Sequence, residues 1–409
     1  MKETTTYSSF DWKSNPAPLA IVMWDFSWLM NHYPTGSFEN FDVCLDGLVT
    51  RGYDAVRLDC FPQLIADSDT DRAQESYFHK KSGMARELWQ NPYSIHSRPR
   101  ESLIEILEGC RKRDIKYGLS SWFLSHGTGR SEQFSGAASL VRAWNETLAF
   151  IDDHGLLENV LYVDLLNEYP LWNGFVWMKN ELARIGGQDA FQCDDEKRNE
   201  PPADLALGRW QGYNQEQRDF YNAFINDSIA GVKKEWPDLK VFACETCDYA
   251  VPWSDTDRSN FDVMDIHLWF CYHKGFHEYT RYFERLHTRE NDHEYTALNA
   301  AVKKYWIECR DELISWMDDE IGQRAGVAKK HGVPIGNTEG WGPINWEEHP
   351  YLDWDFAKDA ARVAVSLARK HGYDFICSTN FVHPQFPGVW NDIEWHREIT
   401  KMIRQPILP

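Results

Sequence analysis

The sequence has no long hydrophobic run. Across its 409 residues, no apolar stretch approaches the roughly 20 residues that a membrane-spanning helix requires. Hydrophobic residues make up 43% of the chain and charged residues 26%, which is the composition of a soluble globular protein. We therefore expect neither a helical membrane protein nor a membrane partner.

Positive charge is also scarce. The chain has 43 Lys and Arg residues against 63 Asp and Glu residues, which gives a formal net charge of −20. Such a charge repels phosphate backbones and anionic lipid surfaces, and the sequence has no basic patch interleaved with aromatic residues. We therefore expect no nucleic acid partner.

The amino terminus, MKETTTYSSFDWKSNPAP, lacks the apolar core of about 7 to 15 residues that a secretory signal contains. The nine cysteines are odd in number, and five of them lie inside apolar periodic segments, where free thiols act as small hydrophobic side chains: Cys44, Cys60, Cys110, Cys244 and Cys377. Both features favour a cytoplasmic location without a disulfide framework.

Eight apolar runs of strand length recur along the chain, and amphipathic segments separate them. This alternation is typical of βα units and a parallel sheet. The runs are LAIVMWD from residue 19, AVRLDCF from 55, KYGLSSW from 116, VLYVDLLNE from 160, KVFACET from 240, FDVMDIHLW from 261, VPIGNTEG from 333 and DFICSTNF from 374.

The spacing of apolar residues predicts helices over 38–51, 101–113 and 356–371. Ser37 is expected to cap the first helix, and Gly52 to close it. The segments TRGYDAVRLD, KKHGVPIGNT and RKHGYDFICS each place basic residues and a Gly before a strand. These three similar junctions suggest one repeated helix-to-strand geometry.

Eight βα units favour a single (β/α)₈ barrel domain over residues 1–409. A doubly wound dinucleotide-binding fold accounts for the sequence less well, because no Gly-rich loop follows the first strand. Long connections leave the strand carboxyl ends at about 63–99, 170–213 and 271–295. The functional site of a barrel lies on that face.

Two glutamates end strands on that face. Asn167 and Glu168 end the fourth predicted strand, and Glu339 ends the seventh. Two carboxylates about 5–5.5 Å apart form the pair of a retaining glycosidase, in which one is the nucleophile and the other is first an acid and then a base. The pair needs unequal surroundings, so that one carboxyl stays protonated while the other is ionised.

Other strand ends offer substrate-binding candidates. Arg57 ends the second strand and could keep Glu339 ionised, although it could instead form a structural ion pair with Asp59; His267 on the sixth strand could orient a carboxylate or a sugar hydroxyl. Further candidates for contacting a sugar follow strands one, three and eight: Trp24, Asp25, His126 and His383.

This ordered set resembles the cellulase-like (β/α)₈ glycoside hydrolases of clan A, that is, family 5 and its relatives. The resemblance rests on Arg at strand two, Asn-Glu at strand four, His-x-aromatic at strand six and Glu at strand seven, and it spans nearly the whole chain. It implies that Glu168 is the acid/base and Glu339 the nucleophile. Asn167 would bond the sugar 2-hydroxyl, Arg57 would lie beneath the nucleophile, and His267 would line the cleavage subsite.

The sequence departs from the family pattern at two strand ends. Many relatives have Tyr where this chain has Trp269, which cannot ionise, and Tyr272 could substitute for it. Many also carry a Trp platform after strand eight, where this chain has Asn380 and Phe381. The platform could come instead from Trp341, Trp122 or Trp390, and Trp28, Trp172 and Trp341 are further stacking candidates on solvent-side loops.

We therefore expect a retaining glycosidase that acts without a cofactor or metal on β-glycosidic bonds, removing the end residue of an oligosaccharide. Endo-action on a polysaccharide, or an arabinofuranoside or galactofuranoside substrate, remains open. Two other classes are alternatives. One is a non-catalytic sugar-binding barrel, and the other is a metal-dependent barrel enzyme that would recruit Asp59, His267, His273 and Glu339.

Overall fold

A computed structural model describes residues 10–12, 14–15, 17–66, 76–78, 88–92, 94–124, 130–169, 175–187, 213–246, 256–282, 292–344 and 346–406. Within these ranges, no helix combines the length and the apolar character needed to cross a membrane. The predicted candidates His126 and Trp172 lie outside the described residues.

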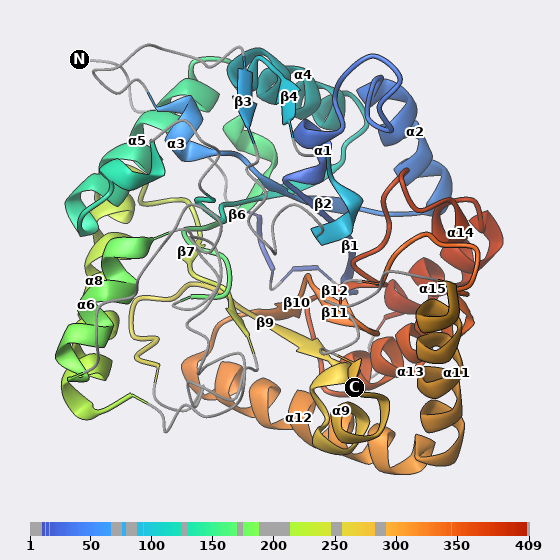
Figure 1. Ribbon diagram of the computed structural model, residues 1–409. Helices are drawn as coiled ribbons and strands as arrows, with labels where there is room; N and C mark the ends of the chain where they lie inside the picture. The colour runs from blue at the N-terminus through green and yellow to red at the C-terminus, as the bar shows by residue number, and fades with distance from the viewer. Residues whose placement is uncertain are drawn as a thin grey trace.

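A parallel sheet occupies the middle of the molecule, and helices surround it (Figure 1). Its strands pair in the order β11-β9-β10-β12-β1-β2-β5-β6-β7, and β8 pairs with β9. The strands are β1 (Leu19–Asp25), β2 (Ala55–Asp59), β5 (Lys116–Ser120), β6 (Val160–Asp164), β7 (Val241–Phe242), β8 (Glu245–Thr246), β9 (Met264–Trp269), β10 (Ile335–Asn337), β11 (Gly340–Trp341) and β12 (Phe375–Cys377). The predicted α/β class with a parallel sheet is confirmed.

Each of the eight predicted runs contains at least one of these strands. The run from residue 240 is divided into β7, which pairs with β6, and β8, which pairs with β9. Only Ala243 and Cys244 separate the two pieces. The run from residue 333 is divided in the same way into β10 and β11, and Glu339 lies between them.

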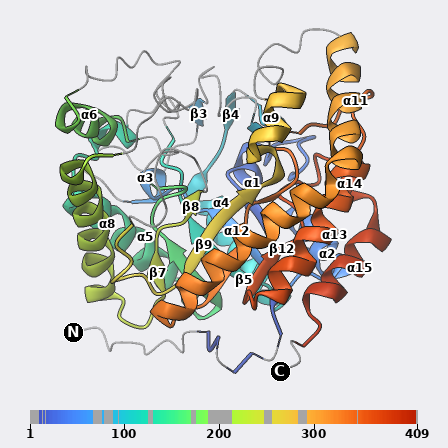
Figure 2. The same ribbon diagram turned by 90° about the horizontal axis from the view of Figure 1, so that it is seen from below.

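Helices cover the outside of the sheet (Figures 1 and 2). The longer ones are α2 (Phe41–Arg51), α4 (Pro99–Lys112), α5 (Ala137–Asp152), α6 (Val176–Ile185), α8 (Gln215–Glu235), α11 (Asp292–Glu308), α12 (Arg310–His331), α13 (Asp355–Lys370) and α15 (Ile393–Ile403). The shorter ones are α1 (Ser27–Met30), α3 (Pro62–Ile65), α9 (Lys274–Thr280) and α14 (Pro387–Trp390). The three predicted helices correspond to α2, α4 and α13.

One predicted cap was wrong. Helix α2 begins at Phe41 rather than near residue 38, and Asn40, not Ser37, accepts the backbone N–H of Val43 at 3.1 Å. The predicted junction geometry is confirmed, because Gly52, Gly332 and Gly372 all have positive φ angles of 84°, 71° and 78°. Glycine adopts this left-handed conformation without the clash that a Cβ would cause.

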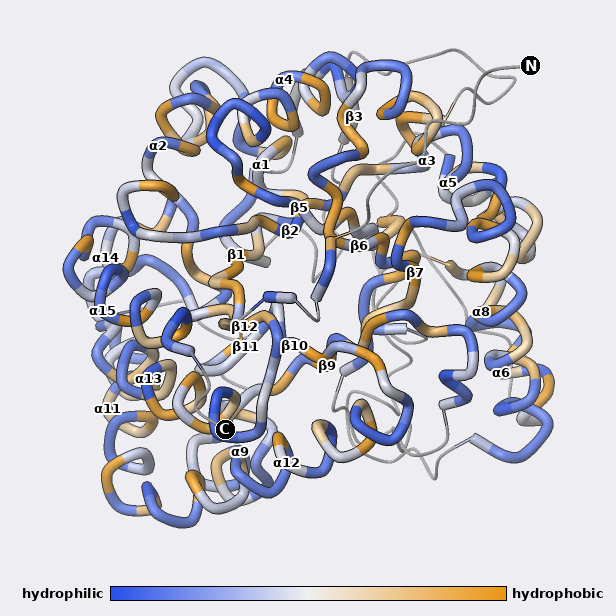
Figure 3. The backbone as a smooth tube through the Cα atoms, turned by 180° about the vertical axis from the view of Figure 1, so that it is seen from behind, coloured by the Kyte–Doolittle hydropathy of each residue, from blue (hydrophilic) through white to orange (hydrophobic). Residues whose placement is uncertain are grey.

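Aromatic rings pack together near the amino-terminal ends of the strands. The ring of Tyr162 on β6 lies 5.6 Å from that of Phe375 on β12. A Cβ on Gly118 would come within 2.3 Å of the Tyr162 ring, and one on Gly336 within 2.2 Å of Phe375. Glycine at these positions lets the rings meet. Figure 3 shows hydrophobic colouring on several central strands, whereas the surrounding helices alternate between hydrophilic and hydrophobic.

Described parts of two of the long predicted connections lie at one end of the sheet. Figure 2 shows the antiparallel pair β3 (Ser76–Phe78) and β4 (Ser94–His96), together with α9, at the end toward which β9 runs. The connection predicted over 63–99 also contains η1, a 3₁₀-helix over Leu88–Gln90. The seven cysteines that the structure describes are free thiols, as expected.

Buried His396 on α15 should make stability depend on pH. Its Nδ1 lies 2.9 Å from the Tyr53 hydroxyl and its Nε2 3.0 Å from the Val389 carbonyl, and burial lowers its pKa to about 3. In the unfolded chain a histidine titrates near pH 6.5, so acid favours unfolding between pH 6.5 and 3. We expect the stability advantage of the wild type over His396→Phe to be about 3 kcal/mol smaller at pH 4.5 than at pH 7. Urea unfolding of both proteins at the two pH values measures this difference in unfolding free energy. A difference that does not change with pH would contradict the prediction.

Candidate active site

The two predicted glutamates meet across a histidine. Glu168 lies in the turn after β6, Glu339 lies between β10 and β11, and His267 projects from β9. His267 Nδ1 is 2.8 Å from Glu168 Oε1 and 3.3 Å from Glu339 Oε2. One ligand atom from each of these three side chains lies within 4.8 Å of the other two. The glutamates are only 3% and 1% exposed, so the pair is almost enclosed.

Arg57 on β2 contacts both His267 and Glu339 and fixes the protonation of His267. Its Nη1 donates to His267 Nε2 at 2.9 Å and to Thr338 Oγ1 at 2.9 Å. Because Arg57 can only donate, His267 Nε2 must accept, and the ring proton is on Nδ1. Burial and then the charge of Arg57 lower the pKa of His267 well below its usual range. The neutral ring therefore donates its Nδ1–H to Glu168.

The carboxylates titrate as a unit. Burial, followed by the charge of Glu168, raises the pKa of Glu339 well above its usual range, while Arg57, whose Nη1 is 3.7 Å from Glu339 Oε2, opposes this shift. Two close carboxyl groups in an enclosed site share a proton at pH values where isolated glutamates would both be ionised. The arrangement can therefore supply one proton donor and one anion.

Two further buried carboxylates, Asp25 and Asp164, contact Arg57. Its Nε is 3.2 Å from Asp25 Oδ1, and its Nη2 is 3.6 Å from Asp164 Oδ2. Burial raises the pKa of Asp25 and of Asp164 to about 6, although Arg57 lowers both. Burial alone would lower the pKa of Arg57, but these carboxylates and Glu339 raise it well above its usual value. Arg57 therefore holds several buried carboxyl groups together.

Removing the Arg57 charge should destabilise the protein more at high pH. In Arg57→Met, Asp25 and Asp164 lose a cationic partner, and breaking a buried ion pair from one side costs about 3–5 kcal/mol. Carboxyl groups whose pKa is raised in the folded state lose stability as the pH rises, so we expect a larger loss at pH 8 than at pH 5. Urea unfolding at the two pH values tests this.

The matched control is Arg324→Met. Arg324 is also buried, but it lies on α12 and pairs with Glu320 at 2.5 Å, away from these acids. We expect its loss of stability to change little between pH 5 and pH 8. The same pH dependence in both variants would contradict a specific role of Arg57 among the acids.

A group of aromatic side chains contacts Asp25, which pairs with Arg57. Trp122 follows β5 and donates its Nε1–H to Asp25 Oδ2 at 2.6 Å. Its ring meets that of Trp89 edge to face at 5.7 Å, and His383 lies 5.9 Å from Trp89. Asn380 accepts from Trp89 Nε1 at 3.1 Å and donates to the Gly340 carbonyl at 3.3 Å when its carboxamide is oriented to satisfy both. Three predicted residues thus gather around Trp89, which the sequence reasoning missed.

Several predicted stacking tryptophans are packed instead of exposed. Trp28 and Trp341 are fully buried rather than solvent-side, and their Nε1 atoms donate to the carbonyls of Asp59 and Cys377. Trp390 lies on α14, where the Arg51 guanidinium covers its ring at 3.8 Å, so it is not available as a sugar platform.

Three other predicted aromatic residues are enclosed. Trp24 is buried, and its Nε1 donates to Val382. Trp269, at the end of β9, is fully buried, and Tyr272 in the following 3₁₀ turn is 8% exposed. The Trp269 Nε1 finds no hydrogen-bond partner among the residues that the structure describes.

The run from residue 240 contributes two site residues that sequence reasoning missed, Thr246 on β8 and Cys244 just before it. Thr246 pairs in register with His267, so both side chains project from the same face of the sheet. Its buried hydroxyl has no partner in the described part of the chain, and the same holds for Asn167 Nδ2. Cys244, two positions earlier, contacts Asn167. Alternation along the run from residue 240 could have identified both Cys244 and Thr246.

The donor set fits a metal ion poorly. Glu168, His267 and Glu339 are close enough to surround an ion. However, His267 Nδ1 carries the ring proton, and the Arg57 cation lies 3.7 Å from Glu339. A metal ligand must be deprotonated, and a neighbouring cation opposes a divalent ion.

The alternative metal-ligand set is not assembled. His273 lies 3.6 Å from Glu312, a residue of α12, rather than beside His267. The Asp59 carboxylate accepts the backbone N–H groups of Phe61 and Trp122 at 2.7 and 2.9 Å.

Comparisons with solved structures agree with this architecture. A candidate glycoside hydrolase from Parabacteroides distasonis is 26% identical, with a TM-score of 0.77 over 96% of this chain and 95% of that one. The endo-β-1,4-mannanase of Thermotoga petrophila is 11% identical, with a TM-score of 0.52 over 97% of this chain and 79% of that one. Cellulose synthase subunit Z of Clostridioides difficile is 11% identical, with a TM-score of 0.50 over 95% and 100% of the two chains.

No protein of curated function matches the chain in a sequence comparison. The family model described as sugar-binding cellulase-like matches residues 21–404, which include every strand-end residue of the site. The fold is that of cellulase-like glycoside hydrolases, and the chain belongs to the cellulase-like family.

Proposed function

We propose that this protein is a retaining glycoside hydrolase that cleaves β-glycosidic bonds, with Glu339 as nucleophile and Glu168 as acid/base. The observation that carries the proposal is the meeting of the two carboxyl groups at His267, with oxygens within 4.8 Å. This separation fits the roughly 5–5.5 Å of retaining enzymes and is too short for the 6.5–9.5 Å or so that inverting enzymes use to admit a water.

In the first step, Glu339 attacks the anomeric carbon while the bond to the leaving oxygen breaks, and Glu168 gives its proton to that oxygen. In the second step, Glu168 takes a proton from water, the water attacks the same carbon, and the Glu339 carboxylate leaves. Arg57, 3.7 Å from Glu339, favours the ionised form of the nucleophile, and the mechanism requires the shared proton on Glu168 when the substrate reacts. No cofactor enters either step.

Asn167 and Thr246 supply hydrogen bonds to the sugar in this proposal. Their Nδ2 and Oγ1 atoms are buried and have no partner among the described residues. A buried polar group without a partner costs about 1–3 kcal/mol, which a substrate hydroxyl recovers when it binds. The Asn167 amide would bond the 2-hydroxyl, a contact that strengthens in the transition state.

We further propose that the sheet is a closed (β/α)₈ barrel. Strands β7 and β8 are then one bent fifth strand, whose first part pairs with β6 and whose second part pairs with β9. The near-complete burial of Glu168 and Glu339 favours a pocket over an open cleft. An enclosed pocket suits exo-action on the end of an oligosaccharide better than cleavage within a polysaccharide.

The test is hydrolysis of aryl β-glycosides, an aryl α-L-arabinofuranoside and an aryl β-galactofuranoside, with and without EDTA. We expect turnover of one of them that EDTA does not change, and an NMR spectrum whose first product keeps the anomeric configuration of the substrate. An inverted first product would refute the retaining mechanism, and loss of activity in EDTA would refute a metal-free one. Cleavage of polysaccharides alone would refute exo-action.

A sugar-binding protein without hydrolytic activity is the second candidate, because the family model describes its members as sugar-binding. Isothermal titration of wild type with oligosaccharides distinguishes the two functions. Binding of a sugar that remains intact after prolonged incubation with the wild type would favour the binding protein, whereas cleavage of the bound sugar would exclude it.

The Thr246 hydroxyl should contribute to substrate binding in the transition state. We expect Thr246→Val to lower kcat/KM about 3- to 10-fold, the value of one neutral hydrogen bond, with little change in unfolding. Thr147→Val on α5 is the matched control, because Thr147 is also buried and its Oγ1 has no partner in the described chain. Equal kcat/KM values in the two variants would contradict the role of Thr246.

A further inference from the structure

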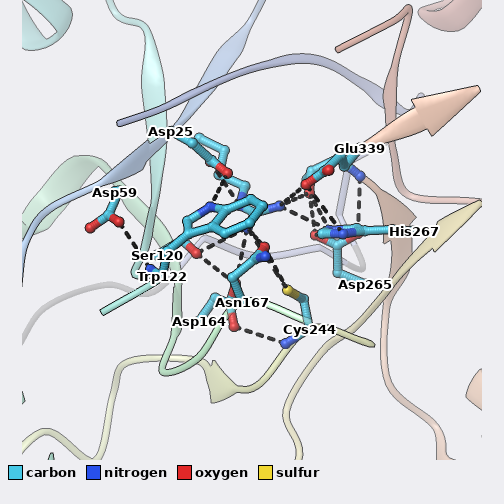
Figure 4. Close-up of polar contacts among 12 residues, drawn as sticks. Asp25, Asp59, Ser120, Trp122, Asp164, Asn167, Cys244, Asp265, His267 and Glu339 are labelled. Atoms are coloured by element: carbon cyan, nitrogen blue, oxygen red, sulfur yellow. Dashed lines mark hydrogen bonds and ion pairs between the residues drawn. The ribbon is translucent and has the colours of Figure 1, made fainter. Parts of the chain in front are cut away.

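Cys244 lies in the floor of the site, between β7 and β8, and is fully buried. Its Sγ accepts the backbone N–H of Glu168 at 3.1 Å, and its carbonyl oxygen accepts the N–H of Tyr169 at 3.0 Å. Figure 4 shows its side chain next to Asn167. Cys244 therefore accepts hydrogen bonds from two consecutive backbone N–H groups, those of Glu168 and Tyr169, just after the end of β6.

The backbone that Cys244 holds is strained. Glu168 has a φ angle of 43°, in the left-handed region that side chains with a Cβ disfavour by about 1–2 kcal/mol. Such a conformation persists only where the surroundings enforce it. The Glu168 N–H points to Cys244 Sγ, so the thiol is placed to stabilise the turn that presents the Glu168 carboxyl to His267.

The same thiol orients Asn167. Burial raises the pKa of Cys244 well above its usual value, so the sulfur keeps its proton. The Sγ is 3.5 Å from Asn167 Oδ1, which also accepts from Arg57 Nη2. Two donors on Oδ1 fix the carboxamide with its oxygen toward the floor, and Nδ2 is left without a described partner.

We propose that Cys244 is a positioning residue for catalysis: its thiol accepts from Glu168 and donates to Asn167, and thereby sets the acid/base and the amide that binds the sugar. This inference rests on the proposed hydrolase function. The thiol is enclosed and does not touch the substrate, so its effect passes through Glu168 and Asn167.

The first test compares Cys244→Ala, Cys244→Ser and the control Cys110→Ala on glycosides with poor and good leaving groups. A shift of about 1 Å in a catalytic group can cost about 100-fold. We expect Cys244→Ala to lower kcat/KM about 10- to 100-fold on a poor leaving group. The loss should be several-fold smaller on a dinitrophenyl glycoside, which needs no proton from Glu168 but still binds Asn167. Serine keeps a donor and an acceptor and should recover part of the loss.

Cys110 is a buried thiol on α4, and its replacement reports the effect of a cavity alone. We expect Cys110→Ala to unfold more readily while keeping the wild-type ratio between the two substrates. Equal losses on both leaving groups in Cys244→Ala, or a serine variant no better than alanine, would overturn the inference.

The second test needs no turnover and so separates this inference from the proposed function. Crystal structures of the wild type and Cys244→Ala are compared at Glu168 and Asn167. We expect the Glu168 φ angle to leave the left-handed region, or its carboxyl group to move away from His267 Nδ1, in the alanine variant. An unchanged turn and an unchanged Asn167 carboxamide would overturn the positioning role, whether or not the wild type hydrolyses a glycoside.

Discussion

Glu339→Gln is expected to lower turnover by at least about 10⁴-fold, because an amide cannot form the ester intermediate that the two-step mechanism requires. The substitution is nearly isosteric. Glu339 Oε2 has no hydrogen-bond partner in the described chain, and burial together with Glu168 raises the pKa of this carboxyl. Replacing an unfavourably buried acid with a neutral amide should leave the unfolding midpoint unchanged or raise it.

Kinetics and urea unfolding of the same preparations measure both effects. Glu308→Gln on the exposed surface of α11 serves as the control, with wild-type activity expected. A 2-deoxy-2-fluoro glycoside with a good leaving group should label the wild type on Glu339. The fluorine slows both steps, and the good leaving group keeps formation of the ester faster than its hydrolysis. A label on another residue, or activity of the glutamine variant above about 1% of wild type, would exclude Glu339 as the nucleophile.

Glu168→Ala is expected to lower kcat/KM far more for substrates with poor leaving groups than for those with good ones. Loss of a general acid costs about 10²–10⁴-fold where the leaving oxygen needs a proton, so natural glycosides should lose kcat/KM by this factor. A dinitrophenyl glycoside leaves as a stable anion and should form the glycosyl-enzyme at nearly the wild-type rate. Its turnover should then stall at the second step, since no base remains to activate water.

Azide provides the decisive comparison. It needs no general base, so it should attack the stalled glycosyl-enzyme of Glu168→Ala and release a glycosyl azide of retained configuration, with faster turnover. In Glu339→Ala no glycosyl-enzyme forms, so azide should not restore a retained product. Equal losses of Glu168→Ala on both leaving groups, without azide acceleration, would remove the acid/base role from this residue.

Much of the fold could be predicted because its signals are local. Each of the eight apolar runs contains at least one strand of the parallel sheet, and the three Gly junctions were recognisable because glycine relieves the same steric clash at each left-handed position. The helix start at Phe41 was misplaced, because Ser37 and Asn40 are both good capping residues. Only the backbone path shows that Asn40 accepts the N–H of Val43.

The candidate residues at strand ends were also visible in the sequence, since the carboxyl ends of parallel strands share one edge. Their contacts were not. His267 lies 99 residues from Glu168, and Arg57 lies 281 residues from Thr338, yet both pairs are hydrogen-bonded. Such separations leave no periodic trace in a single sequence, so the proton on His267 Nδ1 could be assigned only from the folded chain.

The sequence by itself determined the α/β class, where the strands lie along the chain and which chemical groups end them. These features follow from the periodicity of apolar side chains and from local backbone preference. Tertiary structure decided which groups meet. It buried Trp28 and Trp341, covered Trp390 with Arg51, and placed the Cys244 thiol beneath the strained Glu168. Burial and proximity set the pKa values of the site, and both are properties of packing between distant segments rather than of any segment alone.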